Sequence, residues 1–351
     1  MTGVDRFAHE IIRAIDKICE QDALPFTFRV VAPSQLQDPW QLKNIPVTFV
    51  SGFSGHLWEQ VTLPLYAKER PLISLCNTGP VFKKNHHVVI HDATTVAVPE
   101  SFSLKFRLLY KILMPILGWA SKSILTVSEF ARNDIARAFN ITTGNGSVLG
   151  EGGEHILRYA PDESILKKNG LERGKYFLAV SSNAPHKNFR LILDAIELLK
   201  DKNIKVAIAG GQNRSVFGAS ALKNSGNASW LGYVSNEELR ALYENARAFI
   251  FPSIHEGFGL PLVEAMQVGC PIIASSAASI PEVCGEAAIY VDPKNPNDLA
   301  EAIMLIHESD TKRDQLSRLA KHRSELWQWD AAARNLISHL TRIHSVKASK
   351  K

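Results

Sequence analysis

The chain of 351 residues has few cysteines and no strong excess of either charge. Its four cysteines are far apart and form no C-x-x-C pair, so we expect reduced, buried thiols, as in a cytosolic protein. Forty basic residues against 35 acidic ones leave a net charge of +5. This excess is too small and too diffuse for a dedicated nucleic-acid binder, and we expect no nucleic-acid partner.

Long apolar runs are also missing. No run of 18 or more apolar residues occurs, so we expect no membrane-spanning helix. Asp5, Glu10 and Asp16 occupy the region where a secretory signal would be apolar. The content of 45% hydrophobic and 21% charged residues is typical of globular proteins and excludes disorder. At about 150 residues per domain, the length predicts about two domains.

The second half of the sequence alternates short apolar runs with amphipathic stretches. This alternation predicts parallel strands joined by helices in a doubly wound α/β sheet. Ser235 opens one helix and has Glu238 three residues later, which is the spacing of a capping box. The predicted strands are Tyr176–Val180, Lys205–Ala209, a third that ends at Trp230-Leu231, Ala248–Phe251, Pro271–Ala274 and Ala288–Val291, and the predicted helices include Phe189–Leu199 and Leu262–Val268.

The first half repeats this pattern and predicts a second domain of the same kind. The predicted strands are Thr27–Ala32, Pro46–Val50, Leu72–Leu75, Val88–Ile90, Ile124–Val127 and Ser147–Leu149, and the predicted helices are Val4–Glu20, Leu57–Tyr66, Leu104–Ala120 and Glu129–Phe139.

The domain boundaries follow from these patterns. We expect an N-terminal domain over residues 1–165, a C-terminal domain over 166–325 and a helical segment over 326–351, with the charged stretch Pro161–Lys175 as the linker. A doubly wound domain normally opens with a strand that leads into a glycine turn. Here Thr2-Gly3 enters a helix at once, so we expect the first strand to be missing, through a start placed too far downstream or a trimmed chain.

The most informative stretch contains Glu256 and Glu264, between an apolar strand and a helix. Gly257 and Gly259 allow the backbone to approach a ligand closely, and the amino end of a helix favours phosphate. A carboxylate at the position of Glu264 can accept hydrogen bonds from vicinal hydroxyls, as acidic residues do for ribose. A tight glycine turn with one capping glutamate is the alternative, but two glutamates with seven residues between them favour a binding site.

A second stretch places Lys187 just before the helix Phe189–Leu199. There it can present a point charge to a diphosphate held by the helix dipole. A solvated loop lysine is the alternative, and the glutamate motif in the same domain makes that interpretation less favourable.

Together these features resemble the retaining glycosyltransferases of family four, which have the GT-B fold of two facing Rossmann-like domains. The resemblance covers nearly the whole chain. It implies that the N-terminal domain binds the acceptor, that the C-terminal domain binds the nucleotide sugar, and that the C-terminal helix packs back on the N-terminal domain. Trp58-Glu59-Gln60 and the overall layout resemble bacterial mannosyltransferase-like members that build surface polysaccharides. The motifs are the Glu-x7-Glu stretch from Glu256 through Met266, the turn Pro185-His186-Lys187-Asn188, Gly232-Tyr233-Val234, Thr2-Gly3-Val4 with Arg6-Phe7, His91-Asp92 and Thr126-Val127-Ser128-Glu129.

The resemblance implies roles for single residues. Glu256 would hold the hydroxyls of the donor sugar, Lys187 would stabilise the leaving diphosphate, and His91 would act on the acceptor side, and these three are the predicted catalytic residues. The predicted nucleotide-sugar contacts are Gly3, Ser182, Lys187, Val234, Gly257, Phe258, Gly259, Leu260 and Glu264. No Asp-x-Asp stands at a strand end, so the resemblance implies transfer without a metal or other cofactor. Retention implies same-face attack, in which the departing phosphate takes the acceptor proton.

The sequence departs from the family pattern at two places. His186 replaces the usual arginine of its turn, and Ser181-Ser182 replaces a Gly-Arg pair in which the arginine touches the diphosphate. Lys187 must then carry more of the leaving-group charge, helped by the Ser182 hydroxyl or by the helix amino end at Asn188.

His91 allows three interpretations. With His86 and His87 it forms the pattern His-His-x3-His, from which His87 and His91 could bind a metal. It could instead be a buried, hydrogen-bonded histidine at a strand end. The resemblance favours an active-site role against the donor sugar or the acceptor.

The predicted helix Leu104–Ala120 is strongly apolar and carries Lys105, Arg107 and Lys111, with Pro115 expected to kink it. One interpretation is a core or inter-domain helix. The other is a helix that rests on a membrane surface and approaches a polyprenyl-linked acceptor.

The function expected from all of this is hexose transfer, with mannose from GDP-mannose as the best hypothesis, onto a lipid-linked or growing bacterial surface glycan. The enzyme would be cytoplasmic, at the inner face of the cytoplasmic membrane. A GT-B sugar-nucleotide epimerase and a degenerate, non-catalytic partner of a transferase remain alternatives. A nicotinamide dehydrogenase is disfavoured because no Gly-x-Gly-x-x-Gly follows a strand.

Overall fold

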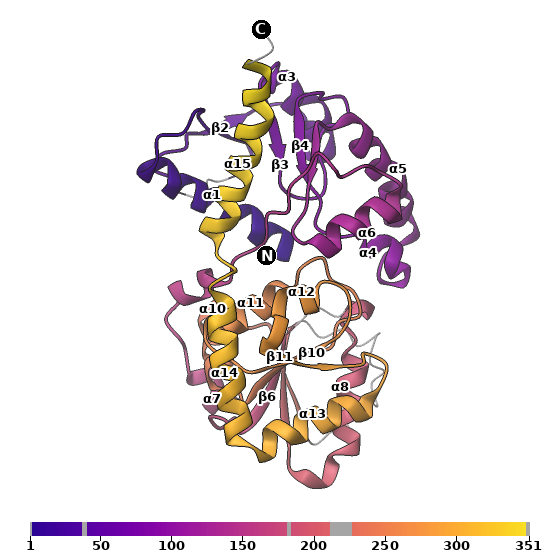
Figure 1. The fold of residues 1–351 in the computed structure, drawn as a ribbon, viewed down its shortest axis with the longest axis vertical. Coiled ribbons are helices and arrows are strands. Elements are labelled where there is room, and N and C mark those ends of the chain that lie inside the picture. Colours follow the sequence, from indigo (N-terminus) through magenta and orange to yellow (C-terminus); the bar gives the residue numbers. More distant parts are fainter. Residues whose placement is uncertain (1, 37–40, 181–183, 211–226, 349–351) are drawn as a thin grey trace. The chain divides into compact units, whose positions relative to one another are not determined.

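The computed structural model describes residues 2–36, 41–180, 184–210 and 227–348 (Figure 1). The chain forms two compact units. Unit 1 comprises residues 1–96, 103–151 and 329–351, and unit 2 comprises residues 97–102 and 152–328. The chain thus enters unit 2 at Gly152, upstream of the boundary expected at residue 165. The expected linker Pro161–Lys175 belongs to unit 2, where α7 (Ser164–Lys168) packs against α10 (Asn236–Asn245).

Unit 2 is built on one six-stranded parallel sheet with the order β11-β10-β9-β6-β7-β8. Every predicted strand of this half is present, and four of them have the predicted bounds, because each is a short apolar run between polar turns. The strands are β6 (Tyr176–Val180), β7 (Lys205–Ala209), β8 (Ala228–Gly232), β9 (Ala248–Phe251), β10 (Ile272–Ser275) and β11 (Ala288–Val291).

The winding of this sheet determines where a ligand can bind. The chain starts at β6 in the middle, adds β7 and β8 on one side, and then crosses to β9, β10 and β11 on the other. The loops after β6 and β9 therefore leave neighbouring strands toward opposite faces of the sheet. In open α/β sheets this switch point is where ligands bind, beyond the carboxyl ends of the strands.

Helices cover both faces of the unit 2 sheet (Figure 1). α8 packs against α13, and α11 packs against α14. Apolar side chains from the strands and from α8 and α13 form the core, in which Ile192, Ile208 and Ile303 are almost fully buried. The main helices, besides α7 and α10, are α8 (Phe189–Leu198), α11 (Leu260–Gln267), α12 (Ile280–Cys284), α13 (Pro296–Glu308) and α14 (Asp310–Ser324).

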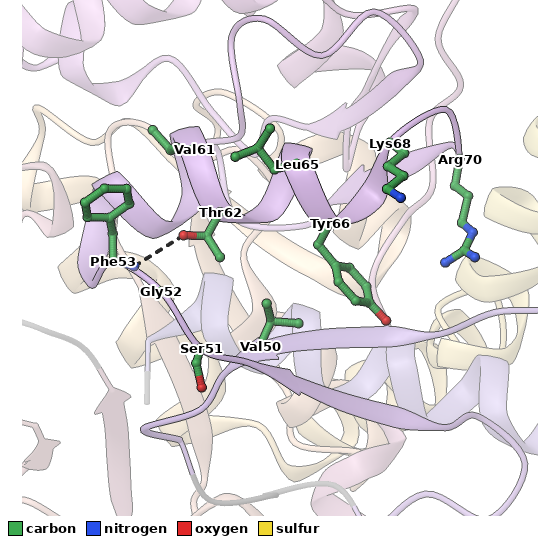
Figure 2. A pocket seen from close by; sticks show the side chains of 10 residues that line it. All are labelled: Val50, Ser51, Gly52, Phe53, Val61, Thr62, Leu65, Tyr66, Lys68 and Arg70. Atoms are coloured by element: carbon green, nitrogen blue, oxygen red, sulfur yellow. Dashed lines mark hydrogen bonds between the residues drawn. The ribbon is translucent and has the colours of Figure 1, made fainter.

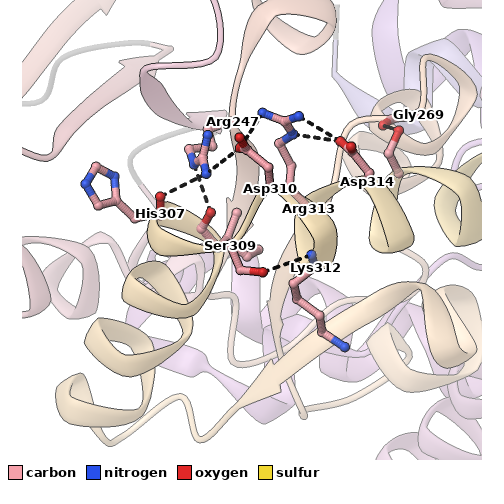
Figure 3. A network of polar contacts seen from close by, with 10 residues as sticks. Arg247, Gly269, His307, Ser309, Asp310, Lys312, Arg313 and Asp314 are labelled. Atoms are coloured by element: carbon pink, nitrogen blue, oxygen red, sulfur yellow. Dashed lines mark hydrogen bonds and ion pairs between the residues drawn. The ribbon is translucent and has the colours of Figure 1, made fainter.

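A polar network fixes the corner between α13 and α14 (Figure 3). The guanidinium of Arg247, just before β9, donates to the carbonyl oxygens of Ile306 and His307 at the end of α13, at 2.8 Å each. It also pairs with Asp310, which in turn binds Arg313 at 2.9 Å. Arg247 therefore satisfies carbonyl groups that the end of a helix leaves without partners.

Unit 1 contains two smaller parallel sheets, β1-β2 and β3-β4-β5. The strand predicted at Ser147–Leu149 is wrong, because that segment makes only an isolated bridge between Val148 and Thr126. The strands are β1 (Val30–Pro33), β2 (Val47–Val50), β3 (Leu72–Ser74), β4 (His86–Val89) and β5 (Ser123–Leu125).

The helices of unit 1 agree closely with the predicted ones. The predicted helix Leu57–Tyr66 is split, because a π-helical stretch (Trp58–Thr62) separates α2 (Gly55–Leu57) from α3 (Leu63–Ala67). Among the described residues, no helix is long and apolar enough to cross a membrane. The other helices of this half are α1 (Gly3–Gln21), α4 (Thr94–Ala97, whose last residue belongs to unit 2), α5 (Leu104–Ala120), α6 (Glu129–Phe139) and α15 (Trp329–Ala348).

The C-terminal helix α15 packs against α1, so the last segment of the chain belongs to unit 1 (Figure 1). Phe7 of α1 meets Trp329 edge-on, with the ring centroids 5.8 Å apart. Arg334 pairs with Asp22 at 2.7 Å, just after α1. The apolar contact supplies most of the stabilisation, since exposed ion pairs contribute little.

The cysteines fit the expectation only in part. Cys270 and Cys284 are buried, and burial raises the pKa of the Cys284 thiol to about 12. Cys76 is exposed and Cys19 is half-buried, so the expectation of four buried thiols is wrong for these two. Cys76 lies in the loop after β3, and its Sγ lies 3.9 Å from the carbonyl oxygen of Val4 in α1. All four are free thiols.

Buried histidines join α15 to the sheet of unit 1. The hydroxyl of Ser123 on β5 shares hydrogen bonds with Nδ1 of His87 at 2.7 Å and with Nε2 of His339 at 2.9 Å. Burial lowers the pKa of His87 to about 3 and, with the nearby Arg342, the pKa of His339 to about 4. Burial and the nearby Lys83 lower the pKa of His86 to about 4. The folded unit therefore holds these rings neutral.

We expect unit 1 to lose stability as the pH falls from 7 to 5. Below pH 6.5 the unfolded chain takes up protons on these histidines and the folded chain does not, so each neutral ring costs about 2 kcal/mol of unfolding free energy at pH 5. Calorimetric unfolding at pH 7, 6 and 5 measures this loss. H339Q should reduce the pH dependence, whereas H322Q, at an exposed position of α14, should leave it unchanged. An equal pH dependence in the wild type and H339Q would contradict the assignment.

Candidate functional site in unit 2

The two loops that leave the switch point carry the two most strongly predicted side chains, and these are in contact. Lys187 follows β6 and Glu256 follows β9, and Nζ of Lys187 donates to Oε1 of Glu256 at 2.6 Å. The side chains are 17% and 12% exposed. Nζ also lies over the ring of Phe251, 5.7 Å from its centroid. The structure therefore brings together two residues that sequence analysis placed in separate motifs.

Asn188 holds these loops in place, a role that sequence analysis did not assign. Its side-chain amide donates to the carbonyl oxygens of Pro252 at 3.1 Å and Pro293 at 2.8 Å, so it joins the loops after β6, β9 and β11. Its backbone adopts the left-handed conformation, with φ at 56°, which asparagine tolerates better than most residues. The sequence signal for it was its place at the end of the Pro-His-Lys-Asn turn.

His186 and Ser279 add further contacts to the same loops. The carbonyl of His186 accepts from the backbone N–H of Ile254 at 2.8 Å. The hydroxyl of Ser279, which is fully buried, contacts the carbonyl oxygens of Glu256 and Phe258 at 3.0 Å each. Nothing in the sequence around Ser279 indicated this role. Because the backbone on both sides of Gly257 is held, the Glu256 carboxylate has a defined position.

His186 also binds the short segment of residues 97–102 that belongs to unit 2. Its Nδ1 lies 3.1 Å from the hydroxyl of Ser101, and its ring stacks on Phe102 with the planes 7° apart. The histidine that replaces the usual arginine of this turn therefore has a packing partner in this chain.

The glycine loop ends at the amino terminus of α11, as predicted. Gly259 has φ at +105°, and a Cβ there would lie 2.9 Å from Cδ1 of Leu262, so a side chain would be strained. No side chain caps α11, and the amino end of a helix favours an anionic group. Phe258 and Leu260 are both buried, and Phe258 packs edge-on against Trp327.

Glu264 lies in α11 and is buried, with 8% of its side chain exposed. Nε2 of His155 donates to Oε1 at 2.9 Å, and the hydroxyl of Tyr243 donates to Oε2 at 3.3 Å. Sequence analysis predicted Glu264 and missed both partners. His155 lies in a 3₁₀ turn (Glu154–Arg158) and Tyr243 in α10, so three elements meet at one carboxylate.

The remaining predicted contacts of unit 2 lie around β8 and after β6. Val234 follows β8 and is half-buried, whereas its neighbour Tyr233 is 84% exposed. The capping box of Ser235 and Glu238 is present at the start of α10, as the sequence predicted. Ser182 lies outside the residues that the structure describes.

His91 and Gly3 lie in unit 1. His91 follows β4 and is buried, with Nε2 donating to the carbonyl of Leu75 at 2.9 Å and Nδ1 lying 3.5 Å from Oε1 of Glu151. Its ring meets Phe7 edge-on at 4.7 Å. Gly3 is the first residue of α1, where a Cβ would meet open space. The roles of both residues stay predictions.

The histidine pattern around His91 does not form a metal site. Nδ1 of His87 contacts Ser123, and Nε2 of His86 contacts Ser74 at 2.9 Å, whereas His91 contacts other groups. Among the residues that the structure describes, no three His, Cys, Asp or Glu side chains could hold a metal ion. The interpretation of His87 and His91 as metal ligands is therefore not supported.

A hollow of about 880 Å³ lies elsewhere in unit 1, between the end of β2 and the helix that ends at Ala67 (Figure 2). Apolar side chains of Phe53, Val61 and Leu65 line it, with Lys68 and Arg70 at one end. None of the predicted site residues lines this hollow, so it is a separate feature of unit 1.

We expect G259A to lower the unfolding free energy of unit 2 by about 1–3 kcal/mol, because the left-handed backbone and the contact with Leu262 both disfavour a methyl group. Chemical denaturation monitored by tryptophan fluorescence measures this change. G174A is the matched control, because Gly174 has φ at +69° but open space around it, and should cost less. Equal losses in the two variants would contradict a steric constraint at the loop.

Comparisons with known proteins identify the family of the chain. A family model described as glycosyl transferases group 1 matches residues 161–323. An O-antigen chain mannosyltransferase B from Escherichia coli is 31% identical over 278 residues, which are 74% of this chain and 72% of that protein. The O-antigen chain mannosyltransferase RfbU from Salmonella typhimurium is 30% identical over 233 residues, which are 64% of this chain and 62% of that protein.

A solved structure supports the same assignment at the level of the fold. Sucrose-phosphate synthase from Thermosynechococcus elongatus matches with a TM-score of 0.72 at 17% identity, over 98% of this chain and 94% of that one. The fold is GT-B, with two Rossmann-like units, as the sequence predicted. The chain belongs to the glycosyl transferases group 1 and is a glycosyltransferase.

Proposed function

We propose that the protein transfers mannose from GDP-mannose, with retention of configuration and without a metal ion, to a lipid-linked or growing surface glycan. The ion pair between Lys187 and Glu256 at the switch point carries this proposal. The relatives from Escherichia coli and Salmonella typhimurium are both named as O-antigen chain mannosyltransferases, which supports mannose as the sugar and a surface glycan as the product.

The ion pair offers groups for both parts of the donor, the leaving diphosphate and the sugar. An ammonium group has three N–H donors, and Lys187 uses one of them on Glu256, so the others can reach the leaving diphosphate. Glu256 accepts on Oε1 and retains Oε2 for a hydroxyl of the donor sugar. The uncapped amino end of α11 adds a positive partial charge at the same carboxyl edge of the sheet.

These groups would stabilise the departing phosphate electrostatically, which is the largest contribution in many enzymes. They replace the charge of a metal ion, and the Ser181-Ser182 departure makes Lys187 the main cation of the motif. In the proposed retaining mechanism the acceptor attacks from the face that the phosphate leaves, and the phosphate oxygen takes its proton. Lys187 disperses the charge on that phosphate until the proton arrives.

We expect K187A and E256A each to lower the transfer rate by about 10²–10³-fold, because each removes a group aimed at charge that develops in the transition state. Transfer of radiolabel from GDP-[¹⁴C]mannose to a membrane-lipid extract measures the rate, in the presence and absence of EDTA. Thermal-shift measurements with GDP-, UDP-, dTDP- and ADP-sugars test the donor, since a bound ligand raises apparent stability.

The control is K175A, because Lys175 precedes β6 where Lys187 follows it and forms an exposed ion pair with Glu172. Its rate should equal that of the wild type. Wild-type turnover in E256A would contradict the role of Glu256, and loss of activity in EDTA would contradict transfer without a metal. Epimerisation of the donor in the absence of an acceptor would favour the epimerase alternative.

The proposal includes contact with an anionic membrane through α5. This helix exposes a continuous apolar face, formed by Leu104, Leu108, Ile112, Ile116 and Trp119 at spacings of three and four residues. Leu104 is 76% exposed and Trp119 is 88% exposed. Soluble proteins rarely expose apolar side chains in such a continuous patch without a partner.

The charges of α5 favour a lipid surface as that partner. The helix carries Lys105, Arg107 and Lys111 and has no acidic residue between Leu104 and Ala120. An apolar face with basic neighbours is typical of helices that lie in the interface of anionic membranes. Contact there would bring the enzyme to a lipid-linked acceptor at the inner face of the membrane.

We expect the protein to float with vesicles that contain phosphatidylglycerol and to stay behind with pure phosphatidylcholine. Changing Lys105, Arg107 and Lys111 to Glu should weaken flotation at least tenfold, since each basic residue near the surface contributes about 1 kcal/mol. The matched control changes Lys167 and Lys168 of α7 to Glu, which should have no effect. Unchanged flotation of the triple variant would contradict the membrane proposal.

A further inference from the structure

Glu264 is held from two directions before any ligand arrives. The imidazole Nε2 of His155 and the hydroxyl of Tyr243 each donate to a different carboxylate oxygen. His155 is 1% exposed and Tyr243 is fully buried, so both are fixed donors. Among the described residues, these are the hydrogen-bond partners of the Glu264 side chain. A buried carboxylate that was not paired in this way would be costly.

The number of acceptor positions leaves room for a diol. An ionised carboxylate has about four lone-pair sites. His155 occupies one site on Oε1 and Tyr243 one on Oε2, which leaves about one site on each oxygen. Two vicinal hydroxyls, as in a ribose, need two such sites on neighbouring oxygens. The two protein donors therefore select which lone pairs a ligand can use.

We propose that His155 is a positioning residue for recognition of the ribose of the nucleotide: it fixes the Glu264 carboxylate in the orientation that accepts the two ribose hydroxyls. This inference rests on the proposed function, in which Glu264 meets the ribose diol. Nothing in the sequence motifs assigns a role to His155. It acts through Glu264 and does not itself touch the nucleotide.

The backbone around His155 is built to keep this contact. Gly153, two residues earlier, lies against α11 so closely that a Cβ would be 2.4 Å from the carbonyl oxygen of Val263. Its N–H donates to the carbonyl of Trp327 at 3.4 Å. Gln267, one turn after Glu264, donates to the same carbonyl of Trp327 at 3.4 Å. The turn that carries His155 is thus docked on the helix that carries Glu264.

The test measures discrimination between ribose and deoxyribose, which a merely structural role would not change. The probes are GDP and 2′-deoxy-GDP, with UDP and 2′-deoxy-UDP as the second pair, titrated calorimetrically into the full chain. In the wild type, loss of a hydrogen bond to a charged group should weaken binding about tenfold or more. H155L should reduce the ratio of the two dissociation constants, for the deoxyribonucleotide and the ribonucleotide, to about twofold. Its binding of inorganic pyrophosphate should stay unchanged.

Two further variants separate positioning from stability. H155Q retains an N–H donor near the place of Nε2 and should restore most of the discrimination. I303A is the matched control, because it removes a fully buried side chain of α13 without touching Glu264, and it should lower thermal stability but keep the ratio. If H155L does not fold, Y243F removes the other donor and should lower the ratio in the same direction.

The outcomes distinguish this inference from the proposed function. Full discrimination in H155L and Y243F would overturn the inference and leave the proposed function intact. Equal binding of GDP and 2′-deoxy-GDP by the wild type, with the same result for the uridine pair, would also overturn it. Binding of neither nucleotide pair by the wild type would overturn the proposed function.

Discussion

The ion pair between Lys187 and Glu256 crosses the point at which the winding of the unit 2 sheet reverses. The two residues are far apart in the sequence, and they meet because β6 and β9 are neighbours and their loops leave toward opposite faces. Without this pairing, the loop after β6 would present a lone cation and the loop after β9 a lone carboxylate. The bonds of Asn188 and Ser279 serve to keep the two backbones where the pair can form. The sheet order thus determines the chemistry of the site.

The sequence predicted the unit 2 strands well because each is a short apolar run between polar turns. β6, β7, β9 and β11 have the predicted bounds, and the capping box at Ser235 is present. The failures occurred where structure depends on distant partners. The segment at Ser147–Leu149 has strand-like residues but pairs only through Val148. Cys76 sits in an apolar run but is exposed, because it lies in the loop after β3 and not in the strand.

In the candidate site, too, residues that follow a local sequence pattern could be predicted, and residues that act through distant contacts could not. Glu256, Lys187, Gly259 and Glu264 could be predicted because their residue types and spacing follow strand ends directly. His155 and Ser279 could not, because each acts across the fold on a residue more than 20 positions away and lies in no recognisable local pattern. Supporting residues of this kind are defined by three-dimensional contact alone. They become visible only when the helices and loops are placed.

The buried polar groups that join α15 to the sheet of unit 1 differ from those near the switch point of unit 2. In unit 1, neutral histidines and serine hydroxyls join α15 to the sheet and carry no charge. In unit 2, the polar groups near the switch point include two carboxylates and an ammonium group. Keeping charge out of the unit 1 network allows it to be buried deeply, whereas the unit 2 groups stay near the surface or accept several donors.

The short segment of residues 97–102 has a consequence for how the chain can be divided. Although it lies within the first third of the sequence, it packs with unit 2, where Ser101 and Phe102 contact His186. A gene fragment that encodes residues 152–328 alone would therefore deprive His186 of its neighbours, right beside Lys187. Neither unit is a continuous stretch of polypeptide, so domain exchange with a related enzyme must carry this insertion along with the C-terminal half.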